Sequence, residues 1–218
     1  MSSDARAELQ KSKPLLGTFV TIRLTGSPIE VLDVAIESAF GELFKVHELM
    51  NFYDPESDVS KINRCEAGKT VLLHPWTWQV LKFSQELAEK TSGAFDVTGG
   101  NFRDIELVDF NRLKVNRSIR VDLSGIAKGF AVDRAVDILR AQMAIMSAEV
   151  RAGGDSRIYG VGGAPDYAES ISSRDGLFVT VIAPECMTAD ALSKIVTPTQ
   201  GWDELLAQMR ATAKLIYS

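Results

Sequence analysis

The sequence predicts one domain of the mixed α/β class, in which strands and helices follow one another along the whole chain. Of the 218 residues, 45% are hydrophobic, which is enough to build a buried core and argues against intrinsic disorder. Some segments alternate apolar and polar residues, as half-buried strands do, whereas others repeat apolar residues every three or four positions, as amphipathic helices do. The sequence contains no internal repeat or low-complexity tract.

The alternation of apolar and polar residues at 16–24 predicts the first strand, and the apolar spacing at 28–50 predicts a long helix. Residues 1–14 are expected to form an N-terminal tail, and residues 15–218 the folded domain. The remaining elements are expected as a helix at 57–64, a strand at 71–73, a helix at 76–90, a strand at 120–123, a helix at 127–142, strands at 149–152 and 177–183, helices at 188–196 and 202–212, and a strand at 213–217.

Charge and composition argue against several classes of protein. Lys and Arg number 24 and Asp and Glu 29, so the formal net charge is −5, which is not the basic footprint of a nucleic-acid-binding protein. No apolar stretch approaches the roughly 18 to 20 residues of a membrane span. The first residues show no signal peptide, which predicts a cytoplasmic protein. The two cysteines and two histidines share no motif, which argues against a Cys-rich zinc site and a Ser-His-Asp triad.

Four short motifs place glycine or a hydroxyl beside Asp or Lys at the end of an expected element. In the first, Gly93-Ala-Phe-Asp96, glycine lets the backbone approach a ligand, and Phe95 can pack on a planar ring. The alternative is a helix end followed by a buried phenylalanine. The second motif, residues 122–129, leads from a strand into a helix whose free N–H groups face an anion, and Lys128 adds a charge suited to a pyrophosphate. The alternative is a tight connection with a solvated lysine.

The third motif, Gly153-Gly154-Asp155, directly follows an expected strand. Its glycines permit conformations closed to other residues, and its aspartate can hold a ribose hydroxyl. The alternative is a simple turn. The fourth motif, residues 188–193, holds Asp190, a hard oxygen ligand for Mg²⁺, with a hydroxyl one turn away. The alternative is an aspartate that complements the helix dipole.

The order of these motifs resembles that of the ApbE family, the FAD:protein FMN transferases. The resemblance covers the chain from about residue 15 to residue 196, and the pieces DLSGIAKG and ADAL together make it specific. The matching segments are residues 15–18 (LLGT), 52–63 (FYDPESDVSKIN), 92–96 (SGAFD), 121–133 (VDLSGIAKGFAVD), 153–155 (GGD), 179–184 (VTVIAP) and 189–192 (ADAL).

The resemblance implies a T-fold-like architecture, a Mg²⁺-dependent site and FAD as the donor substrate. Members move the FMN half of FAD onto a Thr or Ser of an acceptor redox protein and release AMP, and some instead hydrolyse FAD to FMN and AMP. By the motif, Asp190 and Lys128 are the expected catalytic residues. The expected ligands of Mg²⁺ are Asp190, Ser193 and the backbone carbonyl near Ala127. The residues expected to line the FAD site are Tyr53, Phe95, Asp96, Lys128, Gly153, Gly154 and Asp155.

The chain departs from the family pattern in three places. The stretches after Asp96 and after Asp155 are short, and the second lacks the histidine that the family carries there. The family also places a Thr three or four positions after the metal-binding aspartate, where this chain has Ser193 and Lys194, and only the serine can act as a ligand. Either the chain is a reduced homologue that has lost catalysis, or loops are missing from the sequence; we hypothesise the second.

Three functions therefore remain open: a Mg²⁺-dependent FMN transferase, which is our leading hypothesis, a FAD pyrophosphatase, and a flavin-binding or scaffold protein without catalysis. The location is open as well. The resemblance implies a periplasmic protein if a leader has been removed, in contrast to the cytoplasmic location predicted above.

Overall fold

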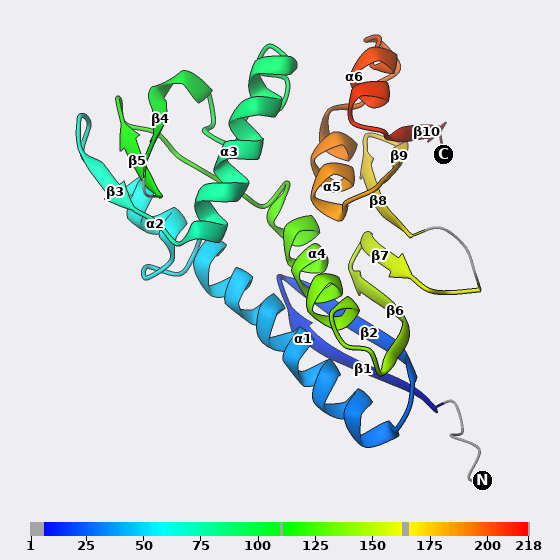
Figure 1. Ribbon diagram of the computed structural model, residues 1–218. Helices are drawn as coiled ribbons and strands as arrows, with labels where there is room; N and C mark the ends of the chain where they lie inside the picture. Colours follow the sequence, from blue (N-terminus) through cyan, green and yellow to red (C-terminus); the bar gives the residue numbers. More distant parts are fainter. Residues whose placement is uncertain (1–6, 110, 163–165, 218) are drawn as a thin grey trace, which may run out of the picture. The chain divides into compact units, whose positions relative to one another are not determined.

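The computed structural model describes residues 7–109, 111–162 and 166–217, and these confirm the mixed α/β class (Figure 1). The chain divides into two compact units, one formed by residues 1–45 and 128–218 and the other by residues 46–127. The helix α1, Ile29–Met50, contributes to both units. Among the described residues, no helix is both long enough and apolar enough to cross a membrane.

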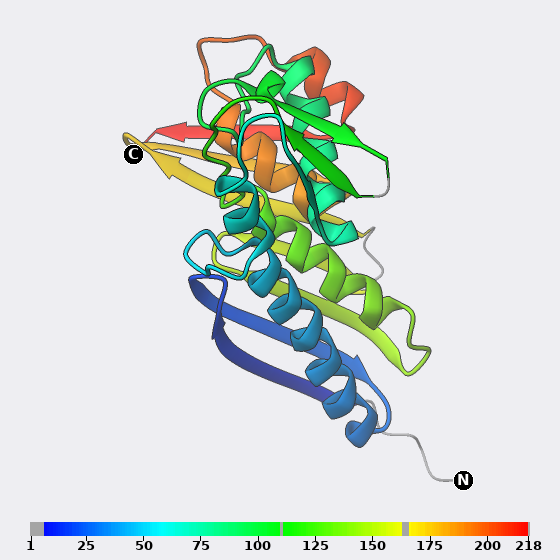
Figure 2. The ribbon, with the colours of Figure 1, turned by 90° about the vertical axis from the view of Figure 1, so that its left-hand side faces the viewer.

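The first unit is built on a seven-stranded antiparallel sheet of order β1-β2-β6-β7-β8-β9-β10. Figure 2 shows the helices α4, Ala127–Arg140, and α5, Cys186–Ile195, crossing one face of this sheet. A short helix, α6, spans Asp203–Gln208. The strands are β1 Ala7–Leu15, β2 Thr18–Gly26, β6 Ile145–Ala152, β7 Asp155–Tyr159, β8 Tyr167–Arg174, β9 Leu177–Ala183 and β10 Thr212–Tyr217.

The second unit contains the helices α2, Asp58–Asn63, and α3, Pro75–Lys90, together with a small antiparallel sheet of order β3-β5-β4. Its remaining elements are β3 Thr70–Leu72, a 3₁₀ turn at Phe102–Asp104, β4 Ile105–Val108 and β5 Arg112–Val115. Helix α3 ends in a Schellman motif, in which Ser92 is the left-handed residue with a φ of +52° and the N–H of the following Gly93 donates to the Ala88 carbonyl at 2.8 Å. The expectation that Gly93 follows a helix end is confirmed.

Strand β1 covers most of the segment that the sequence analysis placed in a tail. It pairs with β2 along its whole length through a two-residue turn, in which Leu16 and Gly17 have φ of +56° and +71°. None of the nine residues of β1 is buried. Because an edge strand of this kind buries no apolar face, its sequence carries no hydrophobic alternation that would predict it.

The strand expected at 120–123 is absent. The Asn63 side chain makes the hydrogen bonds to this segment that a neighbouring strand would otherwise make. The Asn63 amide donates to the Val121 carbonyl at 2.9 Å, and its oxygen accepts the Val121 N–H at 2.7 Å. The next N–H, of Asp122, donates to the Val97 carbonyl at 2.8 Å. Val121 and Asp122 thus find backbone hydrogen-bond partners without belonging to a sheet.

Candidate functional site

Helix α5 is held in place by an aspartate from helix α4. Its own N-cap residue, Glu185, makes no side-chain capping bond within the described part of the chain. Instead the two carboxylate oxygens of Asp133 accept the N–H groups of Cys186 and Met187 at 2.9 and 2.8 Å, and one of them also accepts a bond from Arg157 at 2.7 Å. Burial raises the pKa of Asp133 to about 6, although Arg157 and the two N–H groups act against the rise. This carboxylate therefore anchors the helix end in the first unit.

The two helices approach each other closely at Gly129. A Cβ atom at this position would lie 2.4 Å from the Cys186 carbonyl oxygen and 2.8 Å from the Cβ of Asp190. Gly129 lies in the first turn of α4, where backbone N–H groups have no partner inside the helix. Its N–H donates instead to Asp190 Oδ2 at 3.1 Å. Glycine thus permits the approach that brings the predicted catalytic aspartate to the start of α4.

Two aspartates and two lysines, which we call the charged cluster, meet on the helix-covered side of the sheet. Lys128 Nζ lies 3.3 Å from Asp155 Oδ2 and 3.8 Å from Asp190 Oδ2, and Lys194 Nζ lies 2.8 Å from Asp190 Oδ1. Both carboxylates are buried, whereas the side chains of Lys128 and Lys194 are 26% and 32% exposed. The lysine side chains are therefore the part of the cluster that solvent reaches.

Burial and mutual repulsion shape the titration of this cluster. The pKa of Asp155 is raised because the carboxyl is buried and because Asp190 is close, and Lys128 only partly offsets this. Burial acts to lower the pKa of Lys128, but the charges of Asp190 and Asp155 outweigh it and leave the pKa above its usual value. Lys128 therefore carries a positive charge near neutral pH.

Asp155 enters the cluster from the first position of β7. The turn Gly153–Gly154 joins β6 to β7, with Ala152 and Asp155 as the closing pair and a φ of +62° at Gly153. The two glycines thus form a tight turn between β6 and β7, and their contact with a nucleotide stays a prediction. The neighbouring strand contributes Ser170, whose hydroxyl donates to Asp155 Oδ1 at 2.6 Å. The tight turn aims Asp155 at the helices.

Ser193 and Lys194 follow Asp190 on the same helix. The Ser193 hydroxyl is fully buried and donates to the backbone carbonyl of Asp190 at 2.8 Å, as hydroxyls in helix interiors commonly do. Lys194 donates to this hydroxyl oxygen at 3.2 Å. Within the described residues, Asp190 Oδ1 accepts no directed hydrogen bond, so its contact with Lys194 is an ion pair.

The predicted Mg²⁺ ligands are arranged in a way that does not fit a divalent cation. Hard oxygen donors are present on Asp190 and Ser193, but the two carboxylate oxygens of Asp190 face Lys194 and Lys128. The described ranges contain no group of three or more His, Cys, Asp or Glu side chains that could hold a metal ion. Ala127, the third predicted ligand, begins α4 and belongs to the second unit.

The other predicted flavin-site residues belong to the second unit. Tyr53 is 89% exposed, and its ring contacts that of Phe52 edge-on at 5.3 Å between centroids. Phe95 is only 5% exposed, as the alternative interpretation of its motif expected. Asp96 accepts both the N–H and the hydroxyl of Thr98, at 2.7 and 2.6 Å, in an Asx turn. Of these side chains, Tyr53 offers an open aromatic face.

Three polar residues around the cluster escaped the sequence analysis as functional candidates: Asp133, Arg157 and Ser170. Asp133 lies inside the motif at 121–133, but the sequence does not show that it bonds to Arg157 and to the start of α5. Arg157 and Ser170 lie on β7 and β8, which the sequence did not predict as strands. Their inward positions carry polar side chains, so the hydrophobic alternation that reveals a strand is missing.

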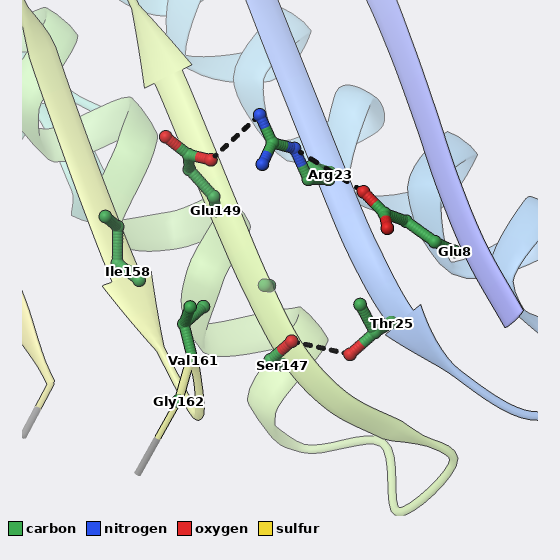
Figure 3. Close-up of a pocket in the computed structure, with 9 residues that line it drawn as sticks. Glu8, Arg23, Thr25, Ser147, Glu149, Ile158, Val161 and Gly162 are labelled. Carbon is green, nitrogen blue, oxygen red and sulfur yellow. Dashed lines mark hydrogen bonds and ion pairs between the residues drawn. The ribbon is translucent and has the colours of Figure 1, made fainter. Parts of the chain in front are cut away.

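A separate pocket of about 220 Å³ lies on the opposite face of the large sheet (Figure 3). Its lining comes from β1, β2 and β6, from Ile158 on β7, and from Val161 and Gly162 after β7. Ile158 is three positions from Asp155 and so points to the other side of the sheet. Arg23 lies between Glu149 and Glu8, at 3.6 and 3.8 Å. None of the predicted site residues that the structure describes lines this pocket.

The structure is that of a mixed α/β protein in which two lysines pair with two buried aspartates. A model of the ApbE family matches residues 16–105 and 100–169, which is more than half of the chain. The chain belongs to the ApbE family, and the resemblance seen in the sequence is confirmed. A search of curated proteins found no match.

Solved structures share the fold. The flavin transferase ApbE from Vibrio cholerae, as a histidine-to-glycine mutant, matches with a TM-score of 0.85 and 22% identity over 97% of this chain and 94% of that one. The apo flavinyl transferase ApbE from Pseudomonas stutzeri gives 0.84 and 19% identity over 100% and 95%. The ApbE protein of Thermotoga maritima gives 0.76 and 23% identity over 97% of each chain.

Proposed function

We propose that this chain is a flavin transferase that moves the FMN half of FAD onto a Ser or Thr hydroxyl of an acceptor redox protein and releases AMP. The observation that carries the proposal is the charged cluster, in which two lysines with partly exposed side chains pair with two buried carboxylates. Membership of the ApbE family and the names of the matching flavin transferases support it. A pyrophosphate is the part of FAD that such a pair of positive charges would bind.

In this reaction the hydroxyl oxygen of the acceptor bonds to the phosphorus of the FMN half. The bond from that phosphorus to the bridging oxygen breaks, and AMP leaves with the bridging oxygen and its electron pair. Negative charge grows on the phosphate oxygens as the bond breaks, and fixed positive charges lower the barrier most where that charge develops. Lys128 and Lys194 are the residues to which we assign this role.

The acceptor hydroxyl must lose its proton during transfer. Among the carboxylates of the charged cluster, Asp155 has its pKa raised by burial and by Asp190, which makes it a better proton acceptor than an ordinary surface aspartate. Ser170 holds one of its oxygens and Lys128 contacts the other. We therefore propose Asp155 Oδ2 as the atom that takes the proton.

The flavin side of the proposal rests on the second unit. Tyr53 is assigned to stack on the flavin ring because its own ring is open to solvent. Phe95 and Asp96 are assigned to shape the loop around it, and the turn at Gly153–Gly154 to meet the nucleotide. The resemblance also implies Mg²⁺ at Asp190, Ser193 and Ala127, but the lysines that face Asp190 do not fit a divalent cation, and no step above depends on one.

The products of the reaction distinguish this proposal from its alternatives. Purified protein is incubated with FAD and an apo redox protein that carries FMN on a threonine in its mature form. AMP is measured by chromatography, and the acceptor by intact mass. Equal amounts of AMP and FMN-labelled acceptor would support the transferase. AMP with free FMN would identify a pyrophosphatase, and no AMP under any condition would leave a flavin-binding scaffold; either result would refute the proposal.

A further inference from the structure

Lys194 occupies the position at Asp190 that a cation would need. It follows Asp190 by four residues on α5, so the helix itself places the two side chains on one face. Its ammonium lies 2.8 Å from Asp190 Oδ1, the carboxylate oxygen to which no described residue donates a directed hydrogen bond. It also donates to Ser193 Oγ, the second oxygen predicted to bind a metal.

The remaining oxygen of Asp190 is engaged as well. Oδ2 accepts the Gly129 N–H at 3.1 Å and lies 3.8 Å from Lys128 Nζ. The charged cluster thus pairs two carboxylates with two ammonium groups and is neutral by formal charge. A divalent cation at Asp190 Oδ1 would have to displace Lys194 and would then stand beside two positive charges at short range.

We propose that Lys194 serves as a tethered cation at Asp190, replacing the divalent metal and closing the site to it. Its ammonium supplies the second fixed positive charge for the pyrophosphate. The assignment of a pyrophosphate to Lys194 rests on the proposed function, whereas the exclusion of the metal does not. At this helix position the family pattern allows a threonine, which is a neutral oxygen donor, where this chain has the positively charged Lys194.

The experiment measures cation binding directly, using Mn²⁺ as the probe because the free ion gives a paramagnetic resonance signal. Wild type, Lys194→Thr and Lys194→Met are titrated with Mn²⁺, together with Lys114→Met. Lys114 is a matched control because it is an ion-paired, 41% exposed lysine on the small sheet and is not a member of the charged cluster. Lys194 is partly exposed, so its variants are expected to fold, which circular dichroism checks.

We expect wild type, Lys194→Met and Lys114→Met to show no saturable Mn²⁺ site, and Lys194→Thr to gain one site that Asp190→Asn in the same background removes. Saturable 1:1 binding to the wild type would overturn the proposal. It would also be overturned if Lys194→Thr gained no site, because another feature would then exclude the metal.

A second measurement tests the charge that Lys194 supplies. Release of AMP from FAD is followed in excess EDTA, where we expect wild type and Lys114→Met to turn over equally and Lys194→Met to be about 100-fold slower. Wild-type activity that EDTA abolishes and Mg²⁺ restores would contradict the proposal. If no condition releases AMP, the proposed function fails, whereas the Mn²⁺ titration still decides whether Lys194 closes the site.

Discussion

At the scale of single residues, the chemistry of this protein depends on how buried charges are neutralised. Asp155 and Asp190 are removed from water, and a buried carboxylate without a partner would cost several kcal/mol. Lys128 contacts both of them from the first turn of α4. The same ammonium therefore has two roles, because it holds the carboxylates in place and presents a positive charge toward solvent.

The first prediction concerns this lysine. Lys128→Met should lower the release of AMP from FAD by about 100-fold, because one fixed charge on the pyrophosphate is lost. Removing the charge also leaves two buried carboxylates facing each other, so thermal unfolding should occur at a lower temperature. Lys128→Arg, which keeps the charge, should retain the melting temperature better than Lys128→Met. Equal turnover in wild type and Lys128→Met would remove Lys128 from the proposed mechanism.

At the scale of elements, the site exists because α4 and α5 pack closely enough for one helix to cap and hydrogen-bond the other. Gly129 permits the close approach, and Asp133, one turn further along α4, caps the start of α5. Neither feature makes a ligand contact in the proposed mechanism. Both are positioning features, and each can be tested through stability.

Gly129→Ala should destabilise the protein by about 1 to 3 kcal/mol, because the added Cβ would meet the Cys186 carbonyl oxygen at 2.4 Å and force the helices apart. Gly41→Ala is the matched control. It also replaces a helical glycine, but a Cβ there meets nothing within 4 Å, so we expect a gain of about 0.5 to 1 kcal/mol. Urea unfolding of both variants checks the prediction, and two gains of similar size would contradict it.

The capping aspartate predicts a pH dependence of stability. The pKa of Asp133 is raised to about 6 from an ordinary value of 3.8, so the folded state binds its proton more tightly than the unfolded state does. The stabilising contribution of this carboxyl is present below about pH 4 and is lost as the pH rises through about 6. From the size of the shift, the loss is about 3 kcal/mol.

Urea unfolding at several pH values between about 4 and 7 measures this contribution. The stability of the wild type relative to Asp133→Asn should fall as the pH rises, because asparagine does not titrate. Asp137→Asn is the control, since Asp137 lies one turn further along α4 and also contacts Arg157, at 3.5 Å, but is 49% exposed. Parallel curves for wild type and Asp133→Asn would show that Asp133 does not cause the dependence.

At the scale of the whole molecule, the inward face of the large sheet is apolar on some strands and polar on others. Strand β2 buries Val20, Ile22 and Leu24. On β7 and β8 the inward positions instead hold Asp155, Arg157 and Ser170, each paired or hydrogen-bonded. Antiparallel pairing lets these strands form from backbone hydrogen bonds whatever their side chains are, so the sheet can carry a polar site without interruption.

This division explains which elements could be predicted. The helices at 28–50, 76–90 and 127–142 and the strand at 177–183 were found nearly at their observed bounds, because each buries a periodic apolar face. The edge strand β1 and the polar strands β7 and β8 were missed, since none has such a face. The helix expected at 202–212 ends at Gln208 in a Schellman motif whose left-handed residue is Arg210, not the glycine or asparagine that would have signalled it.

The sequence by itself determined the family, the fold class and the identity of Lys128, Asp155 and Asp190 as candidates, because these follow from local periodicity and ordered motifs. Only the tertiary structure decided that Lys128 lies against Asp155 and Asp190, that Asp133 caps α5 and that Ser170 holds Asp155. The last two contacts join residues 15 to 54 positions apart in the chain. Which charges neutralise one another depends on distances between elements, and a pattern along the chain does not carry those distances.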